Sequence, residues 1–235
     1  MLKYSAQIKL RESDFDYTDH LKLSTYFDLF QTAACEHADE HGIGFEQSIA
    51  KGIIWVITKL KLEVYKNFKV GDTITLESFP HPKGVVEYVR DYYIYNVNGE
   101  LCAKGCSQWI LLDANTRKIL RPCFDFVGEH TSVWAYEKRI EKVSPVEDEK
   151  IGEYLVDRLD LDHNGHVNNI RYADMVFCFE KDITKPVTFC VINFLSECML
   201  GDRLEIFTDN QGSYTGKRDQ TIAFTAKIIR EDYNP

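Results

Sequence analysis

Long hydrophobic runs are missing from this chain of 235 residues. Its apolar stretches, such as residues 175–179, are far shorter than the roughly 20 residues that a membrane-spanning helix needs. The opening segment, Met1-Leu-Lys-Tyr-Ser, lacks the apolar core that a signal peptide has. We therefore expect a cytoplasmic protein that does not insert into a membrane.

Paired cysteines are also lacking, because the seven cysteines are scattered and form no C-x-x-C pair. An odd, unpatterned set is typical of reduced thiols inside cells and does not indicate a disulfide framework. Five of these cysteines have apolar neighbours and are predicted to be inert core thiols, namely Cys35, Cys102, Cys106, Cys178 and Cys190.

Positive charge is scarce: 28 lysine and arginine residues face 37 aspartate and glutamate residues, which leaves a formal net charge of −9. This balance argues against general binding of nucleic acid, which needs a basic surface to neutralise phosphates. The hydrophobic content of 44% and the charged content of 28% are ordinary for a globular protein. The length suffices for one large domain or two small ones.

A dense polar segment at residues 160–169, DLDHNGHVNN, stands directly before an apolar stretch. A diluted copy lies at residues 14–20, and a second alignment joins Val70-Gly71-Asp72 to Leu200-Gly201-Asp202. The chain therefore contains an internal repeat, with an insertion around residues 42–51 in the first half. The aligned pairs of the polar segment are Asp14 with Asp160, Asp16 with Asp162, and His20 with His166.

Each half has the pattern of an opening strand, a helix and then several strands. In the first half, apolar residues at helical spacing between Leu23 and Ala38 predict a buried helix, and the second half has a predicted helix near residues 169–180. The expected strands cover residues 55–65, 73–79, 85–96 and 101–112, and then residues 189–196, 203–209 and 221–230, with a weak strand around Tyr214.

This order of elements predicts an α+β protein with two tandem hotdog units, in each of which an antiparallel sheet wraps around a long helix. A single unit would leave a sheet edge and an apolar face uncovered, so two units should lie side by side. The expected boundaries are an N-terminal unit at residues 1–136, a charged linker at residues 137–150 and a C-terminal unit at residues 151–235.

Several motifs resemble those of the acyl-acyl carrier protein (acyl-ACP) thioesterases of plants and bacteria. The family's D-x-D-x-N-x-H-V-N-N run matches residues 160–169, and its Glu-Cys signature matches Glu197-Cys198. The remaining matches follow in the family's order over nearly the whole chain: Trp55-Val-Ile-Thr58, Gly71-Asp72, Arg90-Asp91-Tyr92 (with Tyr92 in place of a tryptophan), Ser107-Gln-Trp109 and Thr116-Arg117-Lys118.

The resemblance implies an enzyme that hydrolyses fatty acyl-ACP, releases the free fatty acid and so terminates fatty acid synthesis. It implies that the C-terminal unit is catalytic, that the N-terminal unit supplies the acyl-chain pocket, and that no cofactor is needed. It places Asp162, Asn164, His166 and Glu197 in the site, with Cys198 adjacent.

Two mechanisms fit these residues, because thioester hydrolysis needs an activated nucleophile and donors for the developing oxyanion. In one, Glu197 is the general base or water anchor, Asn164 and His166 position the water and the thioester, and Asp162 orients one of them. In the other, Cys198 is a nucleophile that His166 activates. The sequence leaves both open.

Substrate contacts are predicted on both halves. Backbone N–H groups near Val167, Asn168 and Asn169 would point from a helix N-terminus toward a bound carbonyl. Phe27, Phe30, Trp55 and Ile57 are predicted to form the wall of the acyl tunnel, although ordinary core packing would also bury such residues.

Simpler roles also fit part of the polar segment. Asn164-Gly165 is a common turn dipeptide, and Asp162 could cap the following helix. His163 and His166 form an H-x-x-H pair, but no further ligand follows at a useful spacing, so no metal site is predicted. In the first half Thr18 takes the place of Asn164, so that copy is expected to be structural.

An acidic carrier protein would need clustered basic residues on this chain despite its net charge. The candidates are Arg117-Lys118 with Arg121, Lys138-Arg139 and Lys217-Arg218. The alternatives are a thioesterase for coenzyme A esters and a non-catalytic acyl-binding protein of the same fold. The family resemblance also implies that a homodimer can form.

Overall fold

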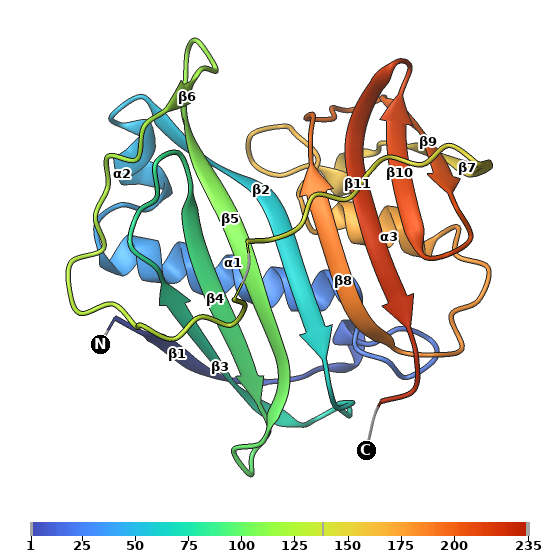
Figure 1. Ribbon diagram of the computed structural model, residues 1–235, viewed down its shortest axis with the longest axis horizontal. Coiled ribbons are helices and arrows are strands. Elements are labelled where there is room, and N and C mark those ends of the chain that lie inside the picture. Colours follow the sequence, from blue (N-terminus) through green and yellow to red (C-terminus); the bar gives the residue numbers. More distant parts are fainter. Residues whose placement is uncertain (1, 138, 234–235) are drawn as a thin grey trace.

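One continuous antiparallel sheet, with helices on one of its faces, organises the computed structural model, which describes residues 2–137 and 139–233 (Figure 1). The helices are α1 (Leu23–Glu40), α2 (Phe45–Ile49) and α3 (Arg171–Phe177). The strands are β1 (Tyr4–Lys9), β2 (Ile53–Val64), β3 (Thr73–Pro80), β4 (Tyr88–Tyr95), β5 (Leu101–Asp113), β6 (Ile119–Leu120), β7 (Glu149–Leu155), β8 (Val187–Phe194), β9 (Arg203–Thr208), β10 (Ser213–Arg218) and β11 (Thr221–Arg230).

The strand order shows two copies of one plan. The order is β1-β3-β4-β5-β2-β8-β11-β10-β9-β7, with β6 paired to β5 outside this path. Each half of the order comes from one half of the chain, and the halves join where β2 pairs with β8, from Lys59↔Asn193 to Glu63↔Phe189. The prediction of two tandem hotdog units in an α+β fold is confirmed.

The repeat extends to hydrogen bonds in the turns. Asp72 accepts an N–H bond from Lys69 through its carboxylate at 2.8 Å, and Asp202 accepts one from Met199 at the same distance. The backbone carbonyl of Asp72 accepts the N–H of Leu10 at 2.8 Å, and the backbone carbonyl of Asp202 accepts the N–H of Val156 at 2.9 Å. Leu10 and Val156 each follow the opening strand of their unit. The Gly-Asp elements therefore tie each opening segment to its own sheet.

Helix α1 is buried along the stripe that the sequence predicts. Tyr26, Phe27, Phe30 and Ala34 are buried in the core that α1 shares with the sheet. The ring of Phe30 stacks on Tyr92 with centroids 4.3 Å apart, and Tyr92 takes the place of the family's tryptophan. This stacking fixes the height of α1 above the sheet.

Helix α3 is shorter than the predicted helix at residues 169–180, since it covers only Arg171–Phe177. The residues after it also pack against the sheet, while the N–H groups of Cys178 and Glu180 still donate to carbonyls four residues back, at 3.0 and 3.2 Å. Phe179 packs over Gly152 of β7, and Glu180 forms an ion pair with Arg230 of β11 at 2.7 Å.

The insertion in the first half forms α2, which the sequence did not predict. Trp55 of β2 fixes this insertion, because its indole N–H donates to the Ile43 carbonyl at 3.0 Å and to the Ser48 hydroxyl at 3.1 Å. The tryptophan of the W-V-x-T motif is therefore the residue that attaches α2 to the sheet.

The segment between β6 and β7 crosses the face of the sheet that lies away from the helices (Figure 1). The Trp134 ring stacks on His81 at 3.4 Å, and the Ala135 N–H donates to Asp91 at 2.7 Å. Glu149 already belongs to β7, so the strand begins inside the expected linker at residues 137–150. Lys138 lies outside the described residues.

The prediction of five core thiols is correct for Cys102, Cys106 and Cys190, and it is wrong for Cys35 and Cys178. Cys35 is exposed because its side chain faces a cavity under α1, and Cys178 is exposed at the end of α3. Within the described residues, no helix has both the length and the apolar character to cross a bilayer.

We expect Gly105→Ala to destabilise the fold, because a Cβ at this position would lie 2.1 Å from the Phe30 ring and 2.9 Å from the Lys61 carbonyl oxygen. Overpacking of this kind costs about 1–3 kcal/mol, which urea unfolding would measure. Combining it with Phe30→Leu should give a smaller loss than the sum of the two single changes. If the two losses in unfolding free energy simply add, the Phe30 ring is not what a side chain at position 105 collides with.

Candidate active site

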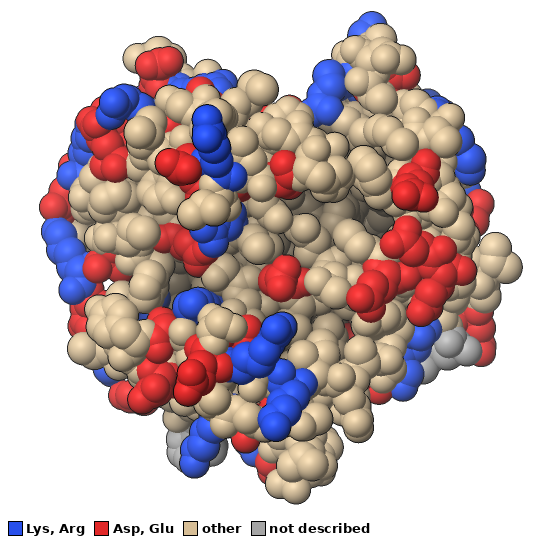
Figure 2. Space-filling view, turned by 180° about the vertical axis from the view of Figure 1, so that it is seen from behind, with Lys and Arg blue, Asp and Glu red and all other residues tan. Residues whose placement is uncertain are grey.

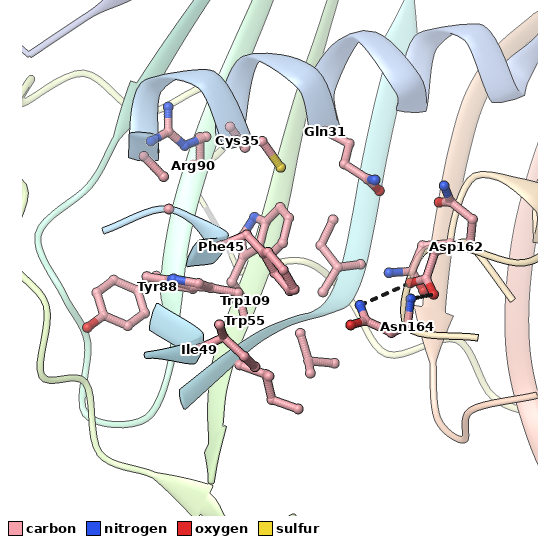
Figure 3. A pocket seen from close by; sticks show the side chains of 18 of the residues that line it. Gln31, Cys35, Phe45, Ile49, Trp55, Tyr88, Arg90, Trp109, Asp162 and Asn164 are labelled. Carbon is pink, nitrogen blue, oxygen red and sulfur yellow. Dashed lines mark hydrogen bonds between the residues drawn. The ribbon is translucent and has the colours of Figure 1, made fainter. Parts of the chain in front are cut away.

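A cavity of about 440 Å³ lies between α1, α2 and the sheet of the N-terminal unit (Figure 3). Most of its wall is apolar or aromatic, and the polar loop at residues 162–169 of the C-terminal unit closes one side. The site is therefore composite, with the wall from one unit and the polar groups from the other. Wall residues labelled in Figure 3 include Cys35, Phe45, Ile49, Trp55, Tyr88 and Trp109.

The Asp162 carboxylate holds this loop together. One of its oxygens accepts the N–H of Asn164 at 2.8 Å and the N–H of His166 at 3.2 Å. Gly165 completes the turn with φ +77°, a conformation that glycine adopts without steric cost. Asp162 is therefore a loop organiser and does not cap α3, which begins at Arg171.

The copy in the first half has the same geometry. Asp16 accepts the N–H of Thr18 at 2.8 Å and the N–H of His20 at 3.2 Å, and Asp19 adopts the positive φ that Gly165 has in the second half. The loop conformation thus belongs to the repeat. Since both halves share it, chemistry particular to the second half depends on the residues that differ.

Two of the three backbone N–H groups predicted to bind a carbonyl are already occupied. The N–H of Val167 donates to the Cys198 carbonyl, and the N–H of Asn168 donates to the Asp160 carbonyl, both at 2.8 Å. The N–H of Asn169 has no hydrogen-bond partner among the described residues. All three residues line the cavity, so Asn169 is the one backbone donor of this group that is free to bind a ligand.

Glu197 follows β8 and meets the loop at the edge of the cavity. Its Oε2 lies 3.6 Å from Nε2 of His166, and its Oε1 accepts a hydrogen bond from Arg117. The pairing of His166 with Met199 as an isolated β-bridge brings the two segments together. The side chains of His166 and Glu197 are 27% and 44% exposed, so solvent reaches both.

Cys198 is buried, with 1% of its surface exposed, and it does not line the cavity. Burial raises the pKa of its thiol, and a hydrogen bond with Tyr172 lowers that pKa in part. No described contact joins the thiol to His166. Adjacent residues of an extended chain point to opposite sides, so Glu197 faces the cavity edge while Cys198 faces the core.

The predicted wall residues separate into two groups. Trp55 and Ile57 line the cavity. Phe27 and Phe30 do not, and this part of the prediction is corrected: both are fully buried, on the face of α1 that packs against the sheet. The helical stripe identified buried residues, but it could not distinguish the core from the cavity.

Gln31 is a cavity residue that the sequence reasoning missed. Its amide points toward Asp162 across the cavity in Figure 3, and it has no hydrogen bond to another described residue. A polar residue within the apolar stripe of α1 was the signal that could have identified it.

The far part of the cavity contains a buried cation. Arg90 lines it, and its Nη1 donates to Nδ1 of His37 at 3.0 Å and to the Ser78 hydroxyl at 3.1 Å. Burial lowers the pKa of Arg90 to about 10 and that of His37 to about 4. At neutral pH His37 is therefore uncharged and accepts from a charged Arg90.

Metal chemistry finds no support in the residues that are described. Among them, no group of three or more histidine, cysteine, aspartate or glutamate side chains is placed to hold a metal ion. His163, the partner of His166 in the H-x-x-H pair, instead packs edge-on against Phe45 with ring centroids 4.4 Å apart.

The environment of Cys198 predicts low reactivity. At neutral pH we expect iodoacetamide to label the exposed Cys123 well before Cys198, because Cys198 is shielded and its raised pKa leaves little thiolate. Peptide mass spectrometry over a time course would measure both rates in one sample. Faster labelling of Cys198 than of Cys123 in folded protein would contradict this assignment.

Comparisons with known proteins match both halves of the chain. Family models match residues 1–130 as the acyl-ACP thioesterase N-terminal domain and residues 143–233 as the acyl-ACP thioesterase C-terminal domain. An oleoyl-acyl carrier protein thioesterase of Arabidopsis thaliana is 24% identical over 95% of this chain and 68% of its own length. An acyl-[acyl-carrier-protein] hydrolase of Cuphea viscosissima is 24% identical over 92% of this chain and 56% of its own length.

Two solved structures share the fold over nearly their full lengths. A crystal structure of an acyl-ACP thioesterase from Bacteroides thetaiotaomicron has a TM-score of 0.88 and 19% identity, covering 98% of each chain. The 12:0-ACP thioesterase from Umbellularia californica has a TM-score of 0.83 and 19% identity, again covering 98% of each chain. With the family models covering both units, the chain belongs to the acyl-ACP thioesterase family.

Proposed function

We propose that this protein hydrolyses the thioester of fatty acyl groups carried on an acyl carrier protein and releases the free fatty acid. The observation that carries the proposal is the meeting of Asn164, His166 and Glu197 at the edge of an apolar cavity. The cavity would hold the acyl chain, and the polar groups would act on the thioester where the chain enters.

Glu197 and His166 are placed to bind the attacking water. Their facing atoms are 3.6 Å apart, which is too far for a direct hydrogen bond but close enough for one water molecule to contact both. Glu197 would take a proton from this water as the oxygen attacks the carbonyl carbon. The C–S bond then breaks, and the leaving sulfur takes the proton back from Glu197, so the products are a carboxylic acid and a thiol.

The carbonyl oxygen needs hydrogen-bond donors as it gains negative charge. Asn169, whose N–H has no partner among the described residues, lines the same cavity as Asn164 and Gln31, which carry side-chain amides. The Asn164 amide also donates to the Asp162 carboxylate at 3.5 Å. We assign these three groups as hydrogen-bond donors to the thioester carbonyl and to the adjoining amide of the pantetheine arm through which the carrier holds the acyl group. In this scheme Asp162 holds the loop that carries Asn164 and His166.

Charge on the surface indicates where a carrier would approach. Acidic side chains gather over the C-terminal half of α1 and over α2, where Glu36, Asp39, Glu40 and Glu46 are exposed (Figure 2). An acidic carrier would avoid that side of the cavity. The exposed Lys118 and Arg121, near the β5–β6 hairpin, offer the basic contact on another side.

The roles proposed for Glu197 and Cys198 can be tested by substitution. We expect Glu197→Gln to lower kcat on acyl-ACP by roughly 10²- to 10⁴-fold, because the general base is lost. Cys198→Ala should keep most of the wild-type activity, since the thiol is buried away from the cavity. Steady-state kinetics with acyl-ACP of graded chain length would measure both.

The same assay distinguishes the alternatives. Equal turnover of acyl-coenzyme A would assign the enzyme to coenzyme A esters, and absence of turnover on every ester would assign a binding protein. A complete loss in folded Cys198→Ala, with a trapped acyl-enzyme in the wild type, would favour the cysteine mechanism over the glutamate one.

Carrier docking predicts a dependence on salt. Hydrolysis of acyl-ACP should weaken as ionic strength rises, through an increase in KM, because salt screens the attraction between exposed charges. An uncharged acyl-pantetheine thioester is the matched control and should respond little. Equal salt responses of the two substrates would contradict docking through basic residues.

The cytoplasmic location and a homodimeric state both stay predictions. The two curated relatives described above are named as chloroplastic proteins. Within this chain the two units already pair through β2 and β8, as two single hotdog chains would.

A further inference from the structure

Arg117 links the two units at the catalytic edge of the cavity. It lies in the turn between β5 and β6 of the N-terminal unit, and its Nη2 donates to Oε1 of Glu197 in the C-terminal unit. The other carboxylate oxygen, Oε2, faces His166 at 3.6 Å. The arginine therefore occupies one side of the carboxylate and leaves the other side toward the position assigned to the water.

The turn that carries Arg117 is rigidly organised. The Asp113 carboxylate accepts the N–H groups of Asn115 and Thr116 at 3.1 and 2.7 Å and the Thr116 hydroxyl at 2.9 Å. Arg117 itself has φ +58°, an unfavourable conformation for a residue with a side chain, and its N–H donates to the Asp113 carbonyl at 2.9 Å. These bonds fix the turn from which the Arg117 side chain extends to Glu197.

We propose that Arg117 is a positioning residue for Glu197: it fixes the carboxylate so that Oε2 stays directed at the attacking water. This inference rests on the proposed hydrolysis by Glu197. Arg117 acts through the glutamate and is not assigned a contact with the substrate.

Two other roles fit the structure less well. As a simple surface ion pair, the contact would add little stability, since the side chains are 39% and 44% exposed. The units are joined instead by the β2–β8 ladder and a shared core. As a docking residue for the carrier, Arg117 would have to give up Glu197, whereas Lys118 and Arg121 are exposed beside it.

A double-mutant cycle tests the proposal. We expect Arg117→Gln to lower kcat about tenfold to a hundredfold, on both acyl-ACP and an acyl-pantetheine thioester, with a smaller change in KM. In the Glu197→Gln background, adding Arg117→Gln should cause no further loss, because the residue through which it acts is absent. Arg117→Lys should recover part of the rate, since it restores a cation at the same place.

Lys181→Gln is the matched control, because it breaks another exposed ion pair, between Lys181 and Glu149 at 2.8 Å, and should keep wild-type kinetics. An equal loss from Arg117→Gln in both backgrounds, or a rise in KM confined to acyl-ACP, would overturn the inference. An Arg117→Gln variant with wild-type kcat in an active enzyme would also overturn it while leaving the proposed function intact. A wild-type protein without turnover would refute the proposed function itself.

Discussion

The pairing of β2 with β8 is the constraint on which the rest of this structure depends. Five residue pairs, from Lys59↔Asn193 to Glu63↔Phe189, join the sheets of two repeated units into one. This ladder provides hydrogen-bond partners for the edge strand of each unit and fixes the relative position of the two units. As a result, the polar loop of the second unit lies against the cavity of the first. Neither unit alone contains all the residues of the candidate site.

Repetition followed by divergence explains how the site is divided. Both halves keep an aspartate that accepts two loop N–H groups, at closely similar distances. The aspartate is therefore a requirement of the loop. The amide of Asn164 is particular to the second half, where the first half has Thr18, whose hydroxyl donates to Asp16. In the proposed mechanism, a loop geometry that both halves share carries chemistry in one copy only.

Several motifs by which the sequence resembles its family have structural roles in this fold. The hydroxyl of Ser107 lies 2.7 Å from the hydroxyl of Tyr92 and accepts the Trp109 indole N–H at 2.7 Å, which joins two strands beneath α1. Trp55 attaches α2 at the cavity. Arg117, a motif residue of the first unit, has a different role, because its side chain contacts Glu197 of the second unit. Motifs that are distant in the sequence thus serve one cavity.

The sequence by itself determined the repeat, the order of elements and the family. Helical spacing located α1, alternation and turn residues located most strands, and the run at residues 160–169 identified the loop. These features depend on local periodicity and on short motifs, which a linear chain displays directly. The attachment of α2 to the sheet depends on Trp55, and Phe179, just after α3, packs over Gly152 of β7, two long-range contacts that local periodicity does not display. Only the tertiary structure separated Phe27 and Phe30, which face the core, from Cys35 and Gln31, which line the cavity, because one helix borders both. It alone brought Arg117 to Glu197 and turned Cys198 inward, since these relations depend on how two units pair and on which side of a strand each side chain leaves.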